Sequence, residues 1–287
     1  MENNTLRNIH SSARDYEQIS CLYSNNKGKI FDDISIQLLE WFDANMAAPL
    51  GAVLDLLQGD FNSIVFESIT SSIQNILQKN GFLSHFGYPQ QLDRYNTTIQ
   101  YQKMKPEDGR YFREYVTTQF INRAELPNMS ESVRKKMSEA MLELFVNAQL
   151  HSKTQHIYTC GQYYPQRHTI EFCIVDTGVG FSEIFKHRFN KNISSIDAIS
   201  WAVQDKNTTK VGMTGGIGLA ILHEFIEINK GSLQIISGNG FYQYDCASTN
   251  TQQLNCSFPG TVVNVTFRTD DPYNYALASK ANERSLF

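Results

Sequence analysis

The chain lacks the features that would direct it to a membrane or into a secretory route. No apolar run approaches the roughly 18 residues of a membrane-spanning helix, and the polar segment that begins at Met1 does not resemble a signal peptide. Neither charge sign dominates, because 25 Lys and Arg residues stand against 29 Asp and Glu residues, a net charge of −4. We therefore expect a cytoplasmic protein with no membrane and no nucleic acid among its partners.

Cysteine is scarce and follows no metal-site spacing. The five cysteines stand at positions 21, 160, 173, 246 and 256, an odd number with no Cys-X-X-Cys pair. Cys173 lies in the apolar segment 171–175, where we expect a buried free thiol. This usage suits a reducing compartment.

No repeat and no low-complexity segment interrupts the chain. With 41% hydrophobic and 19% charged residues, the composition is that of an ordinary globular protein. A length of 287 residues allows two modest domains. Because a polar stretch over residues 90–97 divides the chain, we expect domains over residues 1–92 and 93–287.

The first domain alternates strand and helix patterns, which predicts an α/β layer. Residues 46–57 form a helix that tolerates Pro49 in its first turn. The sequence predicts a strand over residues 62–66 and a second helix over residues 68–78. Residues 34–42 fit either a half-buried strand or a short helix.

The order of strand and helix patterns in the second domain predicts an α+β sandwich, with a mostly antiparallel sheet and helices massed on one face. A period-two pattern indicates a strand over residues 97–104, and we expect further strands over residues 156–164, 169–175, 232–237 and 261–268. A helical pattern covers residues 106–120, 131–150, 193–203 and 215–229. Ser130 is a suitable N-cap for the longest helix.

The longest helix carries a polar row, spaced by four and therefore on one line: Glu139, Glu143, Asn147 and His151. Such a row is usually the solvated face of an amphipathic helix. Here apolar residues surround Glu143 and Asn147, and polar groups in apolar surroundings need partners or a function. The Asn147 carbonyl suits Mg²⁺ beside a triphosphate, and Glu143 suits a general base that activates water.

A second motif, Asp176-Thr-Gly178-Val-Gly180, follows the strand over residues 169–175. A carboxylate at a strand end can accept a hydrogen bond from the adenine amino group. The two glycines let the backbone lie flat against a planar base. The alternative is an Asx turn that only closes the strand.

A third motif spans residues 212–219 and opens the last predicted helix. Its backbone N–H groups can approach phosphate at a helix N-terminus through Gly215, Gly216, Ile217, Gly218 and Leu219. The chain has no P-loop Gly-Lys-Ser/Thr and no dinucleotide-binding unit here. The polar segment 181–213 can form a lid, in which Thr208, Thr209 and Lys210 are candidates for phosphate contacts.

In this order and spacing, the three motifs resemble those of the GHKL superfamily of ATPases, which includes gyrase and the histidine kinases, over residues 97–270. The resemblance implies the Bergerat sandwich fold and the cofactors ATP and Mg²⁺. It implies that Asn147 binds Mg²⁺, Asp176 binds adenine, Gly216 and Gly218 contact phosphates, and Glu143 is the general base. Gly260-Thr261 is similar to the closing element of histidine-kinase-type members, so Thr261 joins the candidate nucleotide-binding residues, and His151 is included from the polar row.

The phosphorylatable histidine motif of those kinases, His-Glu-Φ-Arg-X-Pro, is absent. The only His-Glu pair, His223-Glu224, lies inside a predicted helix and lacks the Arg and the Pro. We therefore interpret His223 as structural and expect no complete sensor kinase.

The first domain is similar to a STAS-like domain, the fold of anti-sigma-factor antagonists, in the turn over residues 42–51 and the helix end over residues 78–83. Regulated members carry a phosphorylatable hydroxyl at this turn, whereas here it reads Asp43-Ala-Asn45-Met46. The resemblance therefore implies a docking role.

Together these features predict an ATP–Mg²⁺ binding protein with a protein partner, which acts as a nucleotide-dependent switch or protein kinase in bacterial-type signalling. An ATP-gated scaffold without turnover and a slow ATPase that forms a homodimer through lid closure are the alternatives.

Overall fold

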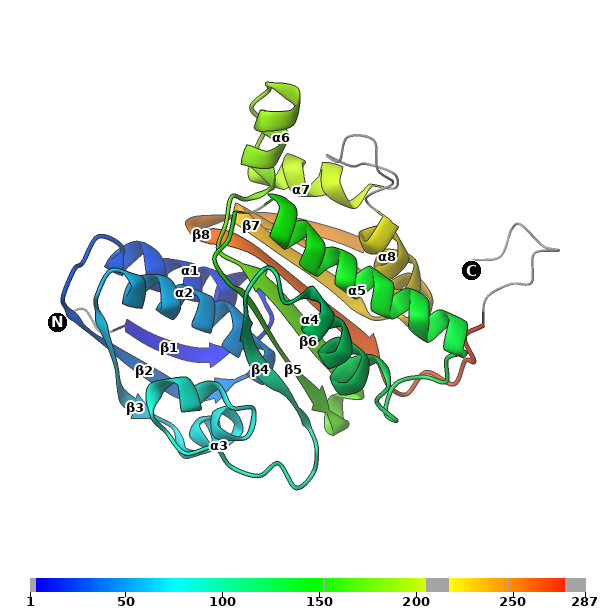
Figure 1. Cartoon of the computed structure of the whole chain (residues 1–287), viewed down its shortest axis with the longest axis horizontal. Helices are drawn as coiled ribbons and strands as arrows, with labels where there is room; N and C mark the ends of the chain where they lie inside the picture. The colour runs from blue at the N-terminus through cyan, green and yellow to red at the C-terminus, as the bar shows by residue number, and fades with distance from the viewer. Residues whose placement is uncertain (1–3, 152, 205–216, 247, 277–287) are drawn as a thin grey trace.

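The protein is built around two β-sheets (Figure 1). A computed structural model describes residues 4–151, 153–204, 217–246 and 248–276. Three parallel strands form the first sheet in the order β1-β2-β3, and five antiparallel strands form the second in the order β4-β5-β6-β8-β7. We refer to residues 4–92 as the N-terminal unit and to the rest as the C-terminal unit.

The N-terminal unit alternates parallel strands with helices, which confirms the predicted α/β pattern. Its elements are β1 (Asn4–Ile9), α1 (Ala13–Asn26), β2 (Asp33–Phe42), α2 (Ala47–Gly59), β3 (Ser63–Ile69) and α3 (Ser71–Lys79). Alternate β2 residues, Ile34, Ile36 and Leu38, are buried against the helices. This resolves the open assignment of residues 34–42 in favour of a strand.

The C-terminal unit is the predicted mixture of a mostly antiparallel sheet and helices. Its strands are β4 (Thr98–Met104), β5 (Ile157–Tyr164), β6 (Thr169–Asp176), β7 (Ser232–Asp245) and β8 (Ser248–Arg268). Its helices are α4 (Gly109–Val116), α5 (Glu131–His151), α6 (Phe181–Phe189), α7 (Ser195–Val203) and α8 (Ile217–Asn229). Ser130 caps α5 as predicted, because its Oγ accepts a 3.4 Å hydrogen bond from Val133 N–H.

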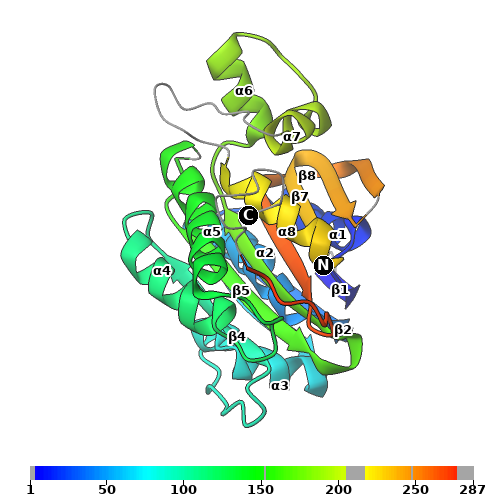
Figure 2. The same ribbon diagram turned by 90° about the vertical axis from the view of Figure 1, so that its right-hand side faces the viewer.

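The central sheet is covered on both faces, by different units. Along β6, Ile170, Phe172 and Ile174 pack with the core of α4, α5 and α8. The intervening residues, Cys173 and Val175, pack with the core of the N-terminal unit. The expectation of helices on one face therefore holds for α4, α5 and α8, whereas α1 and α2 cover the opposite face (Figure 2).

Helix α2 explains how the two sheets share one interior. It is apolar around its circumference, and its buried residues include Pro49, Leu50, Val53, Leu54 and Leu57. A helix that is apolar on all sides is stable only when it is buried on all sides. It meets this condition by lying between the three-stranded and the five-stranded sheet, where its core includes Tyr158, Cys160 and Val262.

A disulfide joins the units, which the cysteine spacing did not predict. Cys21 on α1 pairs with Cys256 on β8. The other cysteines are free, and Cys173 is buried as expected. The disulfide removes the cysteine argument for a reducing compartment. Among the described helices, none is both long and apolar enough to cross a membrane.

Candidate functional site

The structure brings Asp176 and Thr261 together from segments far apart in the chain. Asp176 ends β6 and is the direct register partner of Thr261 on β8, which in turn pairs with Ser237 on β7. The Ser237 and Thr261 hydroxyl oxygens are 3.3 Å apart. Three neighbouring strands thus place a carboxylate and two hydroxyls in one row across the sheet.

This row lies on the face of the sheet that α4, α5 and α8 cover. Side chains alternate along a strand, so Asp176 shares the face of Phe172 and Ile174, which lie in the helix-side core. Thr261 shares the face of Val263 for the same reason. The polar row therefore points toward the helices that carry the other two motifs.

The turn after Asp176 is an Asx turn, the alternative given by the sequence. Its Oδ1 accepts a 2.9 Å hydrogen bond from Gly178 N–H. Gly180 then begins α6 as its N-cap, and a Cβ at Gly180 would lie 2.6 Å from Ser237 Oγ. Close approach to β7 accounts for this glycine, and the same turn fixes the orientation of the Asp176 carboxylate.

Glu143 connects α5 to the start of α8. Its Oε2 accepts a 2.7 Å hydrogen bond from Gly218 N–H, an interaction that a helix N-terminus favours. A Cβ at Gly218 would lie 2.8 Å from Glu143 Cβ and 2.9 Å from the Ala140 carbonyl oxygen. Gly218 is therefore required for the contact between the helices, and Leu219 beside it is a buried core residue.

Asn147 lies one turn beyond Glu143 and is half-buried. No hydrogen bond joins its side chain to any residue in the part of the chain that the structure describes. An amide with no partner among these described residues suits a role as a ligand for a cation or for water. Within the same described residues, no group of three or more His, Cys, Asp or Glu side chains is arranged as a metal site.

The three motifs converge at one end of the five-stranded sheet. The last turns of α5, the end of β6 and the first turn of α8 lie at the end that also carries α6 and α7 (Figures 1 and 2). Other predicted residues fall outside the described residues: Thr208, Thr209, Lys210, Gly215, Gly216 and the side chains of His151 and Ile217. Their assignments to the nucleotide site remain predictions.

His223 has the surroundings expected of a structural residue. Its ring stacks on Tyr244 with 3.9 Å between the ring centroids. Burial lowers the pKa of its imidazole below the usual value. It lies on α8 and is covered by the β7–β8 hairpin rather than directed into the candidate nucleotide site.

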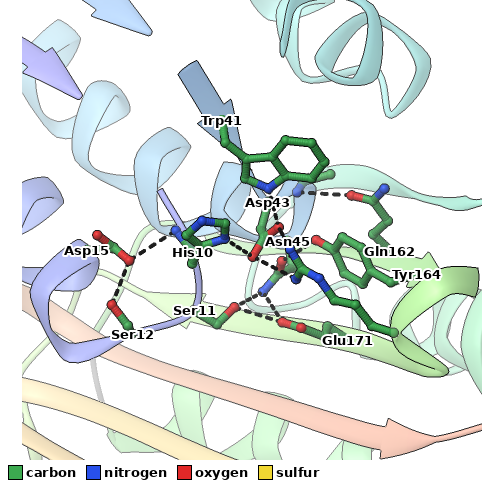
Figure 3. A network of polar contacts seen from close by, with 12 residues as sticks. His10, Ser11, Ser12, Asp15, Trp41, Asp43, Asn45, Gln162, Tyr164 and Glu171 are labelled. Carbon is green, nitrogen blue, oxygen red and sulfur yellow. Dashed lines mark hydrogen bonds and ion pairs between the residues drawn. The ribbon is translucent and has the colours of Figure 1, made fainter. Parts of the chain in front are cut away.

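A polar network joins the units on the opposite face of the sheet (Figure 3). The Asp43 carboxylate is buried and accepts hydrogen bonds from both terminal nitrogens of Arg167 at 3.2 Å and from Trp41 Nε1 at 2.7 Å. His10 Nδ1 lies 3.1 Å from the same carboxylate. A carboxylate held by several donors is satisfied without solvent, which fixes the turn after β2 on the sheet.

The turn over residues 42–51, singled out by its STAS-like pattern, is therefore an internal docking surface. Asn45 is fully buried and donates hydrogen bonds to Glu171 Oε2 and Asn264 Oδ1 of the sheet, both at 3.0 Å. Sequence reasoning did not anticipate Arg167, Glu171 or Asn264 in this network. The polar residues Glu171 and Asn264 within otherwise apolar strands were the only sequence features that could have indicated a polar contact on this face.

Glu171 predicts a pH dependence of stability. Burial, and secondarily the Asp43 charge, raise the pKa of its carboxyl. Between the unfolded and the raised pKa, the folded state binds more protons, so the free energy of unfolding falls as pH rises through this window. Urea unfolding from pH 4.5 to 8 should show a free-energy difference between the wild type and Glu171→Gln, which keeps a carbonyl acceptor for Asn45, and this difference should shift against the wild type as the pH rises. Equal slopes in the two proteins would contradict the assignment.

No protein-family model matches this chain, and no curated protein is significantly similar to it in sequence.

Proposed function

We propose that the protein binds ATP with Mg²⁺ at the end of the five-stranded sheet, in a site of the histidine-kinase-like ATPase type. The observation that carries this proposal is the row of Asp176, Thr261 and Ser237 on the helix-covered face. In the proposed Bergerat arrangement, adenine meets the Asp176 carboxylate and the Thr261 hydroxyl. The N-terminal unit, with its parallel strands and connecting helices, is proposed as a STAS-like module.

The chemistry of the neighbouring side chains fits this ligand. Asn147 offers a partnerless amide within the described residues, and Mg²⁺ needs few protein ligands when phosphate oxygens and water supply the rest. The start of α8 supplies backbone N–H groups and a helix N-terminus, which favour phosphate. In this proposal the nucleotide controls a protein partner in bacterial-type signalling, either as a switch or through phosphoryl transfer.

The proposal predicts that Asp176→Asn weakens ATP binding about 10- to 100-fold, because one charge-assisted hydrogen bond is worth about 1.5–3 kcal/mol. Asparagine keeps the oxygen that accepts Gly178 N–H but replaces the second carboxylate oxygen with a donor. Calorimetric titration with ATP and Mg²⁺ measures the change.

Asp33→Asn is the matched control for this experiment. Asp33 is exposed on β2 of the N-terminal unit, so its loss changes net charge by the same amount without touching the site. An Asp176→Asn protein that binds ATP as tightly as the wild type and the control would refute the adenine assignment.

One observation favours a second function, the ATP-gated scaffold. Glu143, the candidate base, is engaged by Gly218 N–H, so its carboxylate has a structural task that requires no turnover. In this alternative, ATP binding changes how α5 and α8 contact each other and thereby changes the surface offered to a partner or to a second copy of the chain.

A further inference from the structure

The disulfide lies at the rim between the two units. Cys21 on α1 and Cys256 on β8 are 235 residues apart in sequence, and both side chains are partly exposed. Next to this bond, Glu17 on α1 accepts a hydrogen bond from the Asn255 backbone N–H. The bond therefore connects a helix of the N-terminal unit directly to the strand that carries Thr261.

Two of the three remaining cysteines are protected from exchange. Cys160 and Cys173 are fully buried. Burial raises the pKa of the Cys160 thiol to about 12 and raises that of Cys173 well above its usual value. Because the thiolate is the reactive species, neither competes in thiol–disulfide exchange. Cys246 is exposed, and its reactivity has to be removed in any test.

Strand β8 transmits the position of Cys256 to the candidate nucleotide site. Gly260 follows shortly after Cys256 and directly precedes Thr261. The Gly260 backbone lies so close to β6 that a Cβ would be 2.0 Å from the Asp176 carbonyl oxygen. A displacement of this part of β8 therefore reaches the Asp176–Thr261 pair through backbone contact, with no flexible side chain between them.

We expect the units to stay docked when the disulfide is broken. The apolar contacts between α1 and the hairpin remain, since Tyr16, Leu254 and Phe258 belong to one buried core, and the Asp43–Arg167 ion pair is unaffected. In the oxidised form the bond adds a covalent restraint on β8 to this packing.

We propose that Cys21–Cys256 is a reversible thiol–disulfide exchange site that restrains β8 and so sets ATP affinity; this inference rests on the proposed function. The reductant is a low-molecular-weight thiol of the glutathione class. Its thiolate attacks one sulfur, the protein S–S bond breaks, and the released cysteine thiolate takes up a proton. A second thiol attacks the mixed disulfide and releases the second cysteine, so the protein pair gains two electrons and two protons while two thiols form one disulfide.

The test uses the full chain in a Cys246→Ser background, equilibrated in reduced or in oxidised glutathione. Alkylation with a maleimide reports the state of the pair, and calorimetry reports ATP affinity in the presence of Mg²⁺. The oxidised form is expected to bind ATP about fivefold more tightly, because a restrained site loses less freedom on binding. The matched control, Cys21→Ser with Cys256→Ser in the same background, should bind like the reduced form in both buffers.

Amide hydrogen exchange over residues 176–178 and 255–262 separates this inference from the proposed function. Exchange there should be faster in the reduced form and in the double-serine control. If neither form binds ATP, the proposed function fails and the exchange rates alone decide on the restraint. The inference would be overturned if the pair stays reduced in oxidised glutathione, or if the oxidised and reduced forms bind ATP with equal affinity. If ATP does not bind, equal exchange rates in the two forms would overturn it.

Discussion

Gly260→Ala is expected to lower the free energy of unfolding by about 3 kcal/mol or more. The new Cβ would lie 2.0 Å from the Asp176 carbonyl oxygen and 2.8 Å from Thr177 Cα. These are backbone atoms, so no side-chain rotation relieves the overlap, and the Gly260 φ of +152° is one that L side chains rarely adopt. The strands β6 and β8 must separate at the Asp176–Thr261 pair, and ATP affinity should fall together with stability.

Urea unfolding measures the effect, and Gly59→Ala is the matched control. Gly59 ends α2, and a Cβ there would meet no atom within 4 Å. Alanine also has a higher helix propensity than glycine, so the control should be as stable as the wild type or slightly more stable. A Gly260→Ala protein with the unfolding midpoint of the control would show that β6 and β8 are less tightly apposed than described.

Glu143→Gln is expected to reduce phosphate release about 10²-fold or more while ATP affinity stays within a few-fold of the wild type. Glutamine retains the oxygen that accepts Gly218 N–H but cannot accept a proton from water. Glu143→Ala removes both functions and should also weaken the contact between α5 and α8. Steady-state phosphate release and calorimetric ATP titration, measured on the same preparations, separate the two roles.

Glu139→Gln provides the control, because Glu139 lies one turn earlier on α5 and is exposed. It removes the same charge from the same helix without touching α8. If Glu143→Gln releases phosphate at the wild-type rate, Glu143 is not the base. If the wild type itself releases no phosphate and labels no partner, the ATP-gated scaffold is the remaining function.

The sequence predicted most of the C-terminal unit because its elements carry strong local patterns. The strand over residues 169–175 is mostly apolar, and the helix over residues 131–150 has both a cap at Ser130 and a polar row. These signals need no knowledge of tertiary contacts. The register that pairs Asp176 with Thr261 was not predictable in this way, since it depends on which strands become neighbours.

The elements that sequence reasoning missed lack such patterns. β7 and β8 extend well beyond the predicted residues 232–237 and 261–268 into a long hairpin. The extension of β8 begins Ser-Thr-Asn-Thr-Gln-Gln and is exposed, so its strand state follows from pairing with β7 rather than from burial. Gly238 and Gly240 mark register shifts within β7, and glycine in a strand usually weakens the strand prediction.

The side-chain contacts that dock the two units could not be predicted from the sequence. The turn at Asp43 carries two polar residues, Asp43 and Asn45, and both are buried. Their burial depends on Arg167 and Glu171, which are distant in the chain. Complementary buried polar groups contributed by separate segments leave no periodic signal.

The position of α2 between the two sheets has a consequence for synthesis. The ribosome completes this helix long before it reaches β6 and β8, which cover its second apolar face. Nascent chains fold domain by domain from the N-terminus, but the β5 and β8 residues that pack against this helix, such as Tyr158 and Val262, are synthesised much later. The N-terminal segment therefore has an exposed apolar surface until the C-terminal unit has been synthesised. Chaperone binding to α2 during translation would protect this surface from aggregation.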